Sequence, residues 1–222
     1  MYSPSVDGFS FRGSAVRYTE SPPPEDLIEV VHCFWELRTL AELPDDFHYH
    51  ALPDACVNLL FNLRDTEIAG VTALHTEATT LNLGRSFHYA GIQFYPGAWQ
   101  GDRAEVVDRY VGKPYSGKLP LVETSRRLKE LEFMDMAPAL LELVHWCIAH
   151  GHAKANPITA RILSNIDAIR SVADMAKLVQ LSTRQLQRTL QKLTGFAPHD
   201  LIKVLRLQQS FRNHYLDLYA DQ

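Results

Sequence analysis

The segment SVADMAKLVQLSTRQLQRTLQKLTGFAP, residues Ser171–Pro198, has the pattern of two short helices joined by a tight turn. In the first helix, apolar residues recur at the i, i+3, i+4, i+7 spacing that marks one buried helix face. They are Val172, Met175, Ala176 and Val179. Ala176 is small enough to let a second helix cross closely. The turn falls at Gln180–Leu181, so the segment is predicted to be a helix-turn-helix.

The second helix has recognisable signals at both ends. Ser182 is a suitable N-cap, and Gln185 three residues later completes a capping box. Gly195 is suited to a left-handed C-cap, and Pro198 to the first turn of a further helix. The predicted buried face consists of Leu186, Leu190 and Leu193.

The opposite face of the second helix carries arginine, glutamine and threonine but no acidic residue. Such side chains suit base edges and phosphates in a major groove. The candidate DNA-contacting residues are Ser182, Thr183, Arg184, Gln187, Arg188, Gln191 and Lys192. The alternative interpretation is an amphipathic helical hairpin with a solvated face, although such a face usually mixes both signs of charge.

This segment resembles the first helix-turn-helix of AraC/XylS-type transcriptional regulators. The matching positions are Ala176, Ser182, Leu186, Arg188, Thr194, Gly195 and Pro198. Two positions depart from the pattern: Gln180 stands where the family often has glycine, and Ala197 where it commonly has a capping serine. The resemblance implies a DNA-binding regulator that pairs as a homodimer on two half-sites, with RNA polymerase as a candidate partner.

In that family a long linker helix follows and leads to a second helix-turn-helix. Residues 198–211 have the linker-helix pattern, with Leu201, Ile202, Leu205 and Gln208 expected to face inward. Residues 218–222 resemble the turn before the second recognition helix, so we expect the sequence to stop before that helix, as a cut rather than a natural end. One unit alone is expected to bind DNA more weakly than two.

The first half of the chain is rich in short apolar or alternating runs separated by Pro, Gly, Asp and Asn. Such spacing predicts a small β-barrel or sandwich. The expected strands are 15–18, 30–37, 48–51, 56–63, 69–73, 78–83 and 89–95, with 27–31 as an alternative helical turn. The phrases LPDACVNLLFN (52–62) and GIQFYPGA (91–98) also resemble a group of AraC-type regulators with a β-rich N-terminal domain. That resemblance implies regulation but identifies no effector.

Two helical patterns follow, at 124–132 and 137–150. Asp135 is expected to cap the second helix, and Pro138 to lie in its first turn. Its apolar stripe is Leu140, Leu141, Val144, Cys147 and Ile148, which is consistent with domain core or with a dimerisation helix. The sequence GHAKANP (151–157) is expected to be a linker. We therefore expect an α+β protein with a β-rich sensing domain (1–118), a helical extension (119–154) and an all-α DNA-binding module (155–222).

Charge is distributed unevenly over the 222 residues, whose formal net charge is −4. Residues 155–222 hold nine Lys/Arg and five Asp/Glu, so this part is basic and the remainder acidic. Such asymmetry fits a DNA-binding module joined to a sensing domain. The three cysteines, the lack of a signal peptide and the lack of an 18-residue apolar run predict a cytoplasmic protein with no membrane association.

Histidines raise a second hypothesis. His48 and His50 lie two apart in a predicted strand, so both imidazoles could face one metal ion, faintly like a metal-binding cupin. The glutamate and the later histidine of the cupin pattern are missing. The cysteines stand isolated in apolar runs, and no catalytic dyad or phosphate loop is recognisable. We therefore expect a non-enzymatic regulator without a cofactor, responding to a small-molecule effector, and keep a metal-dependent enzyme or metal sensor as the alternative.

Overall fold

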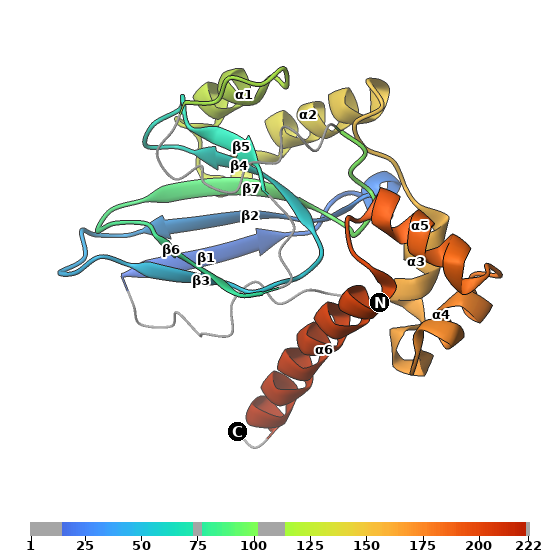
Figure 1. Ribbon diagram of the computed structural model, residues 1–222. Coiled ribbons are helices and arrows are strands. Elements are labelled where there is room, and N and C mark those ends of the chain that lie inside the picture. Colours follow the sequence, from blue (N-terminus) through green and yellow to red (C-terminus); the bar gives the residue numbers. More distant parts are fainter. Residues whose placement is uncertain (1–14, 73–76, 102–113, 221–222) are drawn as a thin grey trace.

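The computed structural model describes residues 15–72, 77–101 and 114–220, with side chains as far as Ser210. A β-rich region of two antiparallel sheets comes first, and the helices α1 to α6 follow it (Figure 1). The predicted α+β class is therefore confirmed. The predicted domain boundaries stay predictions. The helical extension shares its core with the sheet.

The larger sheet has five strands in the order β1-β2-β7-β4-β5, and β3 pairs with β6 in a separate two-stranded sheet. Every predicted strand overlaps one of the strands β1 to β7 in the described residues. Their bounds are β1 Val16–Ser21, β2 Val31–Thr39, β3 His48–Ala51, β4 Val57–Asn62, β5 Ala69–Val71, β6 Thr79–Asn82 and β7 His88–Phe94. The signal that located them is short apolar or alternating runs separated by turn residues.

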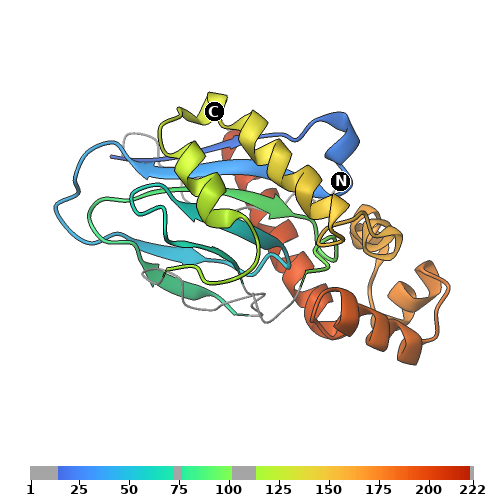
Figure 2. The ribbon, with the colours of Figure 1, turned by 90° about the horizontal axis from the view of Figure 1, so that it is seen from above.

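Both faces of the larger sheet are covered. Helices α1 (Leu121–Leu128) and α2 (Ala137–Ala149) lie across one face (Figures 1 and 2). Their shared core includes Phe34, Leu59, Phe61, Ile92, Phe94, Leu121, Leu128, Leu140 and Val144. The β3–β6 pair covers the other face, where the core includes Cys33, Trp35, Leu37, Tyr89, Phe47, Tyr49 and Leu83. A bulge between Val31 and Cys33 shifts the alternation of β2 at that end.

Helix α2 is part of this core, and its predicted stripe is only partly correct. Leu140, Val144 and Cys147 are buried, whereas Leu141 is half-buried and Ile148 is 36% exposed. The predicted cap by Asp135 is wrong. The N-cap is Met136, and it makes no side-chain cap bond. The short 3-10 helix η3 (Phe133–Asp135) runs into α2 through a helical Met136, so Asp135 lies one residue before the N-cap position.

Other element ends also differ from the sequence-based expectation. Helix α1 starts at Leu121 and ends at Leu128, earlier than the predicted 124–132. The turn after the prolines is the 3-10 helix η1 (Glu25–Leu27), which shares only Leu27 with the alternative helical turn at 27–31. Pro138 lies at the start of α2, as predicted.

The predicted linker is tied to the sheet domain by backbone hydrogen bonds. The amide of Lys154 donates to the carbonyl of Ala98 (2.9 Å), and the amide of Gln100 donates to the carbonyl of His152 (2.7 Å). Asn156 then caps α3 (Pro157–Ser164) by accepting from the amide of Ile158 (3.1 Å). The linker is therefore an ordered connection that fixes where α3 begins.

The remaining helices form a second core, which we call the helical module. Its elements are α3, η4 (Ile166–Ala168), α4 (Val172–Leu178), α5 (Thr183–Leu193) and α6 (Pro198–Ala220). The four inward residues predicted for α6 are all buried. Ala55 and Cys56 of the sheet domain belong to the same core, and the Gln208 side chain donates to the Pro53 carbonyl at 2.8 Å. The module is thus packed directly on the loop before β4.

Helix α6 is longer than expected. It passes the predicted end near Phe211 and continues to Ala220, so residues 218–220 are helical and do not form the expected turn. No glycine or proline interrupts residues 199–220, which explains why the helix continues. Asp221 and Gln222 lie outside the described residues. None of the helices in the described ranges is both long and apolar enough to span a membrane.

A close approach at the middle of the larger sheet requires a glycine. Gly91 of β7 lies directly opposite Trp35 of β2, and the indole covers it. The indole Nε1 then donates to the Asn58 Oδ1 on β4 (3.0 Å), so one side chain spans three strands. A Cβ at position 91 would lie far inside van der Waals contact with the ring.

We expect Gly91→Ala to lower the free energy of unfolding by about 1–3 kcal/mol, because it overpacks this site. Urea denaturation measures the loss. In a Trp35→Ala background the same change should cost much less, since the clashing ring is gone. An equal cost in both backgrounds would contradict the proposed clash.

The contact of α6 with the sheet domain gives a second prediction. Gln208→Ala leaves the buried Pro53 carbonyl without this donor, which should cost about 1–3 kcal/mol of unfolding free energy. The matched control is Gln209→Ala, since Gln209 donates to Asp167 at the exposed surface. The control should cost less than about 0.5 kcal/mol. Similar losses in urea denaturation of the two variants would argue against a structural role for the Gln208 contact.

Candidate nucleic-acid interface

The turn between α4 and α5 joins two short helices at the predicted position. Ser171 caps α4 by accepting from the amide of Asp174 at 3.1 Å. Gln180 adopts the left-handed conformation, with φ of +57°, and the amide of Leu181 donates back to the carbonyl of Ala176 at 3.0 Å. The absence of glycine at position 180 therefore leaves a non-glycine residue in a conformation that disfavours a Cβ.

Both ends of α5 are held by the predicted caps. The Ser182 hydroxyl accepts from the Gln185 amide (3.3 Å), and the Gln185 side chain accepts from the Ser182 amide (3.0 Å). This is a complete capping box. Gly195 has φ of +79° at the other end, as predicted for a left-handed C-cap. The boundaries of α5 are therefore set by local sequence.

The two faces of α5 differ in burial. Leu186 and Leu190 are fully buried against the helical module, while Leu193 is half-buried. All seven candidate DNA-contacting residues are exposed: Ser182, Thr183, Arg184, Gln187, Arg188, Gln191 and Lys192. We call these residues the α5 polar face. The module lies at the end of the molecule where β2 begins and β7 ends (Figure 1).

Charge on the α5 polar face is uncompensated within the helix, because α5 has no acidic residue. The side chains of Arg184, Gln187 and Arg188 make no hydrogen bond or ion pair within the described part of the chain. Their donors are therefore available to a ligand. They lie at i, i+3 and i+4, which places them along one side of the helix.

Gln191 differs from its neighbours. Its side-chain amide donates to the carbonyl of Gly195 at 2.8 Å, so it helps to end the helix. Glutamine four residues before a C-terminal glycine is a signal that could have suggested this role. To contact DNA, Gln191 would have to give up this bond.

A buried polar network lies in the sheet domain close to the helical module, and sequence reasoning missed it. Gln93 is 2% exposed and donates to the Asp54 carboxylate (2.8 Å), while its oxygen lies 2.7 Å from the His32 Nδ1. Burial raises the pKa of Asp54 to about 7, and hydrogen bonds from backbone amides oppose that rise. Burial also lowers the pKa of His32. The network therefore favours uncharged side chains.

The metal hypothesis finds only part of its predicted geometry. His48 and His50 are both exposed on β3, and their ring nitrogens contact the carbonyl of Asp46 (3.2 Å) and the hydroxyl of Thr80 (3.0 Å). Among the residues described, no group of three or more His, Cys, Asp or Glu side chains could hold a metal ion. The three cysteines are buried without disulfides, and burial raises the pKa of each thiol. They are core residues, as expected.

The turn gives a further prediction. Gln180→Gly should raise the free energy of unfolding by about 0.5–1 kcal/mol, because glycine adopts the left-handed conformation without steric cost. The control is Gln187→Gly, also exposed but inside α5, which should lose about 1 kcal/mol. Thermal or urea denaturation of both variants measures the two signs. A loss in both would contradict the strain assigned to Gln180.

Comparison with known proteins adds one finding. Residues 19–101 match a family described as a domain of unknown function (DUF6597). No curated protein and no solved structure matches the chain significantly. The match begins within β1 and extends past the end of β7, so it is confined to the β-rich region and includes none of the helices α1 to α6.

Proposed function

We propose that this chain is a sequence-specific DNA-binding transcriptional regulator that reads a major groove with α5. The observation that carries the proposal is the α5 polar face itself. It presents exposed arginine and glutamine side chains, without acidic residues, on a helix whose ends and buried face are fixed by its own sequence. A helix positioned this rigidly can bring the same side chains to the same bases each time.

The chemistry of the individual residues supports this role. Arginine pairs best with guanine and glutamine with adenine, so Arg184, Gln187 and Arg188 are the proposed base-reading residues. Ser182 and Thr183 lie at the N-terminus of α5, where backbone amides and the helix dipole favour a phosphate. Lys192 is the proposed second phosphate contact, near the other end of the helix.

We further propose that the chain belongs with the AraC/XylS-type regulators. Among the positions on which the resemblance rests, Ala176, Leu186 and Thr194 are buried, Ser182 caps α5, and Gly195 has a positive φ. The DUF6597 match covers the β-rich region and carries no assigned activity. In this proposal the β-rich domain binds a small-molecule effector or pairs two copies, and RNA polymerase is a further partner.

The metal-dependent alternative has weaker support. Two histidines share one exposed face of β3, but the described residues supply no third ligand near them. Structural and catalytic zinc sites take at least three protein ligands. Metal analysis of untagged protein separates the two functions, because a stoichiometric metal would favour the alternative.

The central test removes both arginines of the α5 polar face. Arg184→Ala/Arg188→Ala should lower affinity for the preferred duplex by about a hundredfold or more, since each specific contact contributes about 1–3 kcal/mol. Fluorescence anisotropy at fixed salt measures the affinity. The duplex is selected from a random library by the unaltered protein.

The matched control is Arg126→Ala/Arg127→Ala on α1. It removes the same charge from exposed arginines that pair with Glu67 and Glu142, on the sheet domain and off the helical module. Its affinity should change less than about twofold, because these exposed ion pairs contribute little. Equal DNA binding by the unaltered protein and by Arg184→Ala/Arg188→Ala would overturn the proposed function.

A further inference from the structure

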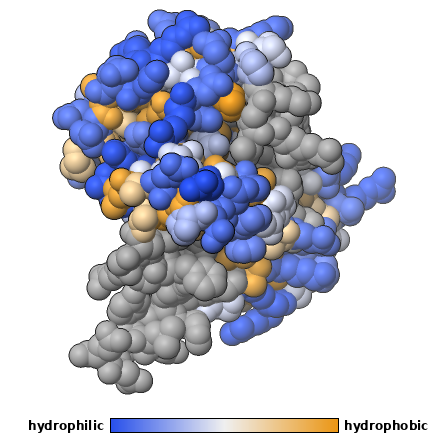
Figure 3. Space-filling model, turned by 90° about the vertical axis from the view of Figure 1, so that its left-hand side faces the viewer, coloured by the Kyte–Doolittle hydropathy of each residue, from blue (hydrophilic) through white to orange (hydrophobic). Residues whose placement is uncertain are grey.

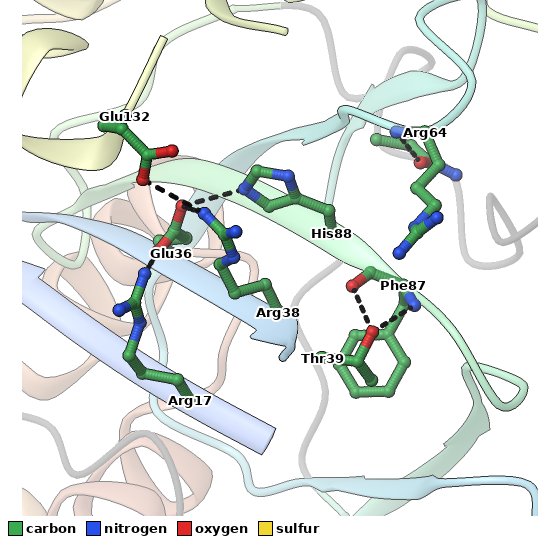
Figure 4. Close-up of polar contacts among 9 residues, drawn as sticks. Arg17, Glu36, Arg38, Thr39, Arg64, Phe87, His88 and Glu132 are labelled. Atoms are coloured by element: carbon green, nitrogen blue, oxygen red, sulfur yellow. Dashed lines mark hydrogen bonds and ion pairs between the residues drawn. The ribbon is translucent and has the colours of Figure 1, made fainter. Parts of the chain in front are cut away.

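A fully buried carboxylate lies at the end of the larger sheet away from the helical module. Glu36 of β2 is 0% exposed and is enclosed by Arg17, Arg38 and His88 (Figure 4). His88 Nε2 lies 2.8 Å from one carboxylate oxygen, and Arg17 Nη2 lies 3.5 Å from the other. Arg38 Nη1 lies 3.7 Å from Glu36 and 3.3 Å from Glu132.

Burial and pairing act in opposite directions on this carboxylate. Burial by itself raises the pKa of Glu36, but the hydrogen bond from His88 and the charges of His88, Arg38 and Arg17 together lower it. Glu36 is therefore ionised and holds the basic groups in place. The carboxylate of Glu36 thereby fixes the orientation of the Arg38 and His88 side chains, as supporting residues behind a binding site fix the side chains that contact the ligand.

A pocket opens beside these oriented groups. It has a volume of about 340 Å³ and lies between the end of β2, the start of β7, the residues after β4 and the residues that follow α1. It is lined by Arg38, Thr39, Leu63, Arg64, His88, Lys129 and Glu130. Leu63 is the one apolar lining residue, and the described part of this end of the molecule is largely hydrophilic (Figure 3).

Arg38, Arg64 and Lys129 give the pocket lining three positive charges against one negative charge, and Arg38 also pairs with Glu36 and Glu132 outside the lining. Arg64 and Lys129 form no ion pair within the described ranges. Both contacts of Arg38 with carboxylates use Nη1, so its Nε and Nη2 have no protein partner among the described residues. Glu130 is the single acidic lining residue.

We propose that this pocket binds a small molecule through an oxyanion group, a carboxylate or a phosphate. A guanidinium presents parallel donors that match two oxygens of either group, and a lysine adds a point charge. The volume lies at the lower end of the range for small-molecule sites, which suits a compact polar ligand. The polar lining disfavours an apolar one.

If the bound anion is an effector that controls DNA binding, that role rests on the proposed regulatory function. Anion binding by the pocket does not rest on it. The pocket lies at the Arg38–His88 end of the β2–β7 pair, and the helical module lies at the Val31–Phe94 end. The two sites therefore do not overlap. Binding at one can be measured without the other.

The test titrates the full chain with inorganic phosphate and, separately, with succinate, at constant ionic strength, by calorimetry. We expect saturable binding of at least one of them with a dissociation constant in the range of about 0.1–5 mM, as ions with so few heavy atoms allow. Arg64→Ala/Lys129→Ala should weaken it about tenfold or more, since two charge-assisted contacts are lost. The anion that binds identifies the group, and binding of both supports the shared chemistry.

The control is again Arg126→Ala/Arg127→Ala, which removes two exposed positive charges from α1 outside the pocket lining. It should change anion affinity less than about twofold, because exposed pairs contribute little. Two results would overturn the site: no saturable binding below about 10 mM, or equal weakening in both variants. A specific pocket must bind the anion more tightly than the general charge of the protein surface does. Binding that leaves DNA affinity unchanged would overturn its effector role alone, while the Arg184→Ala/Arg188→Ala result decides DNA binding separately.

Discussion

The adjacent strands β2 and β7 constrain the rest of the molecule, because neither has a solvent-facing side. Apolar residues of both strands point to α1 and α2 on one face and to the β3–β6 pair on the other. Strands buried on both faces leave little room for variation, as Trp35 over Gly91 shows. The helical extension is therefore a necessary cover for the sheet, and it would expose a large apolar surface if it moved away.

Polar residues on these two strands occur where the apolar layer ends. Gln93 bonds with Asp54 and His32 at the end next to the helical module, and Glu36 bonds with Arg38 and His88 at the other. A buried polar group is tolerated only when it is paired, so each network fixes the positions of its members. The two networks consequently place an ordered set of polar groups at each end of one rigid layer.

Local sequence predicted the parts of the fold that local physics controls. Short apolar or alternating runs located the strands, and the capping box and Gly195 fixed the ends of α5, because these signals act within a few residues. The Glu36–His88 contact joins residues 52 apart in sequence, and the Gln208–Pro53 contact joins residues 155 apart. No periodicity encodes such contacts, so the cationic pocket and the contact of the module with the sheet domain became visible only in the folded chain. Asp135 failed as a cap because a 3-10 turn, which the pattern does not distinguish, took its place.

The loop from Pro53 to Cys56 shows how the two halves of the chain depend on each other. Ala55 is 2% exposed and has φ of +59°, a conformation that costs a non-glycine residue free energy. That strain persists only where surrounding contacts compensate for it. Here they come from both sides: Asp54 accepts from the Cys56 amide at 2.9 Å, and Ala55 and Cys56 pack in the core of the helical module. Since Gln208 of α6 holds the Pro53 carbonyl, the loop keeps its strained shape while the module is docked, and the orientation of α5 relative to the sheet is set by this junction.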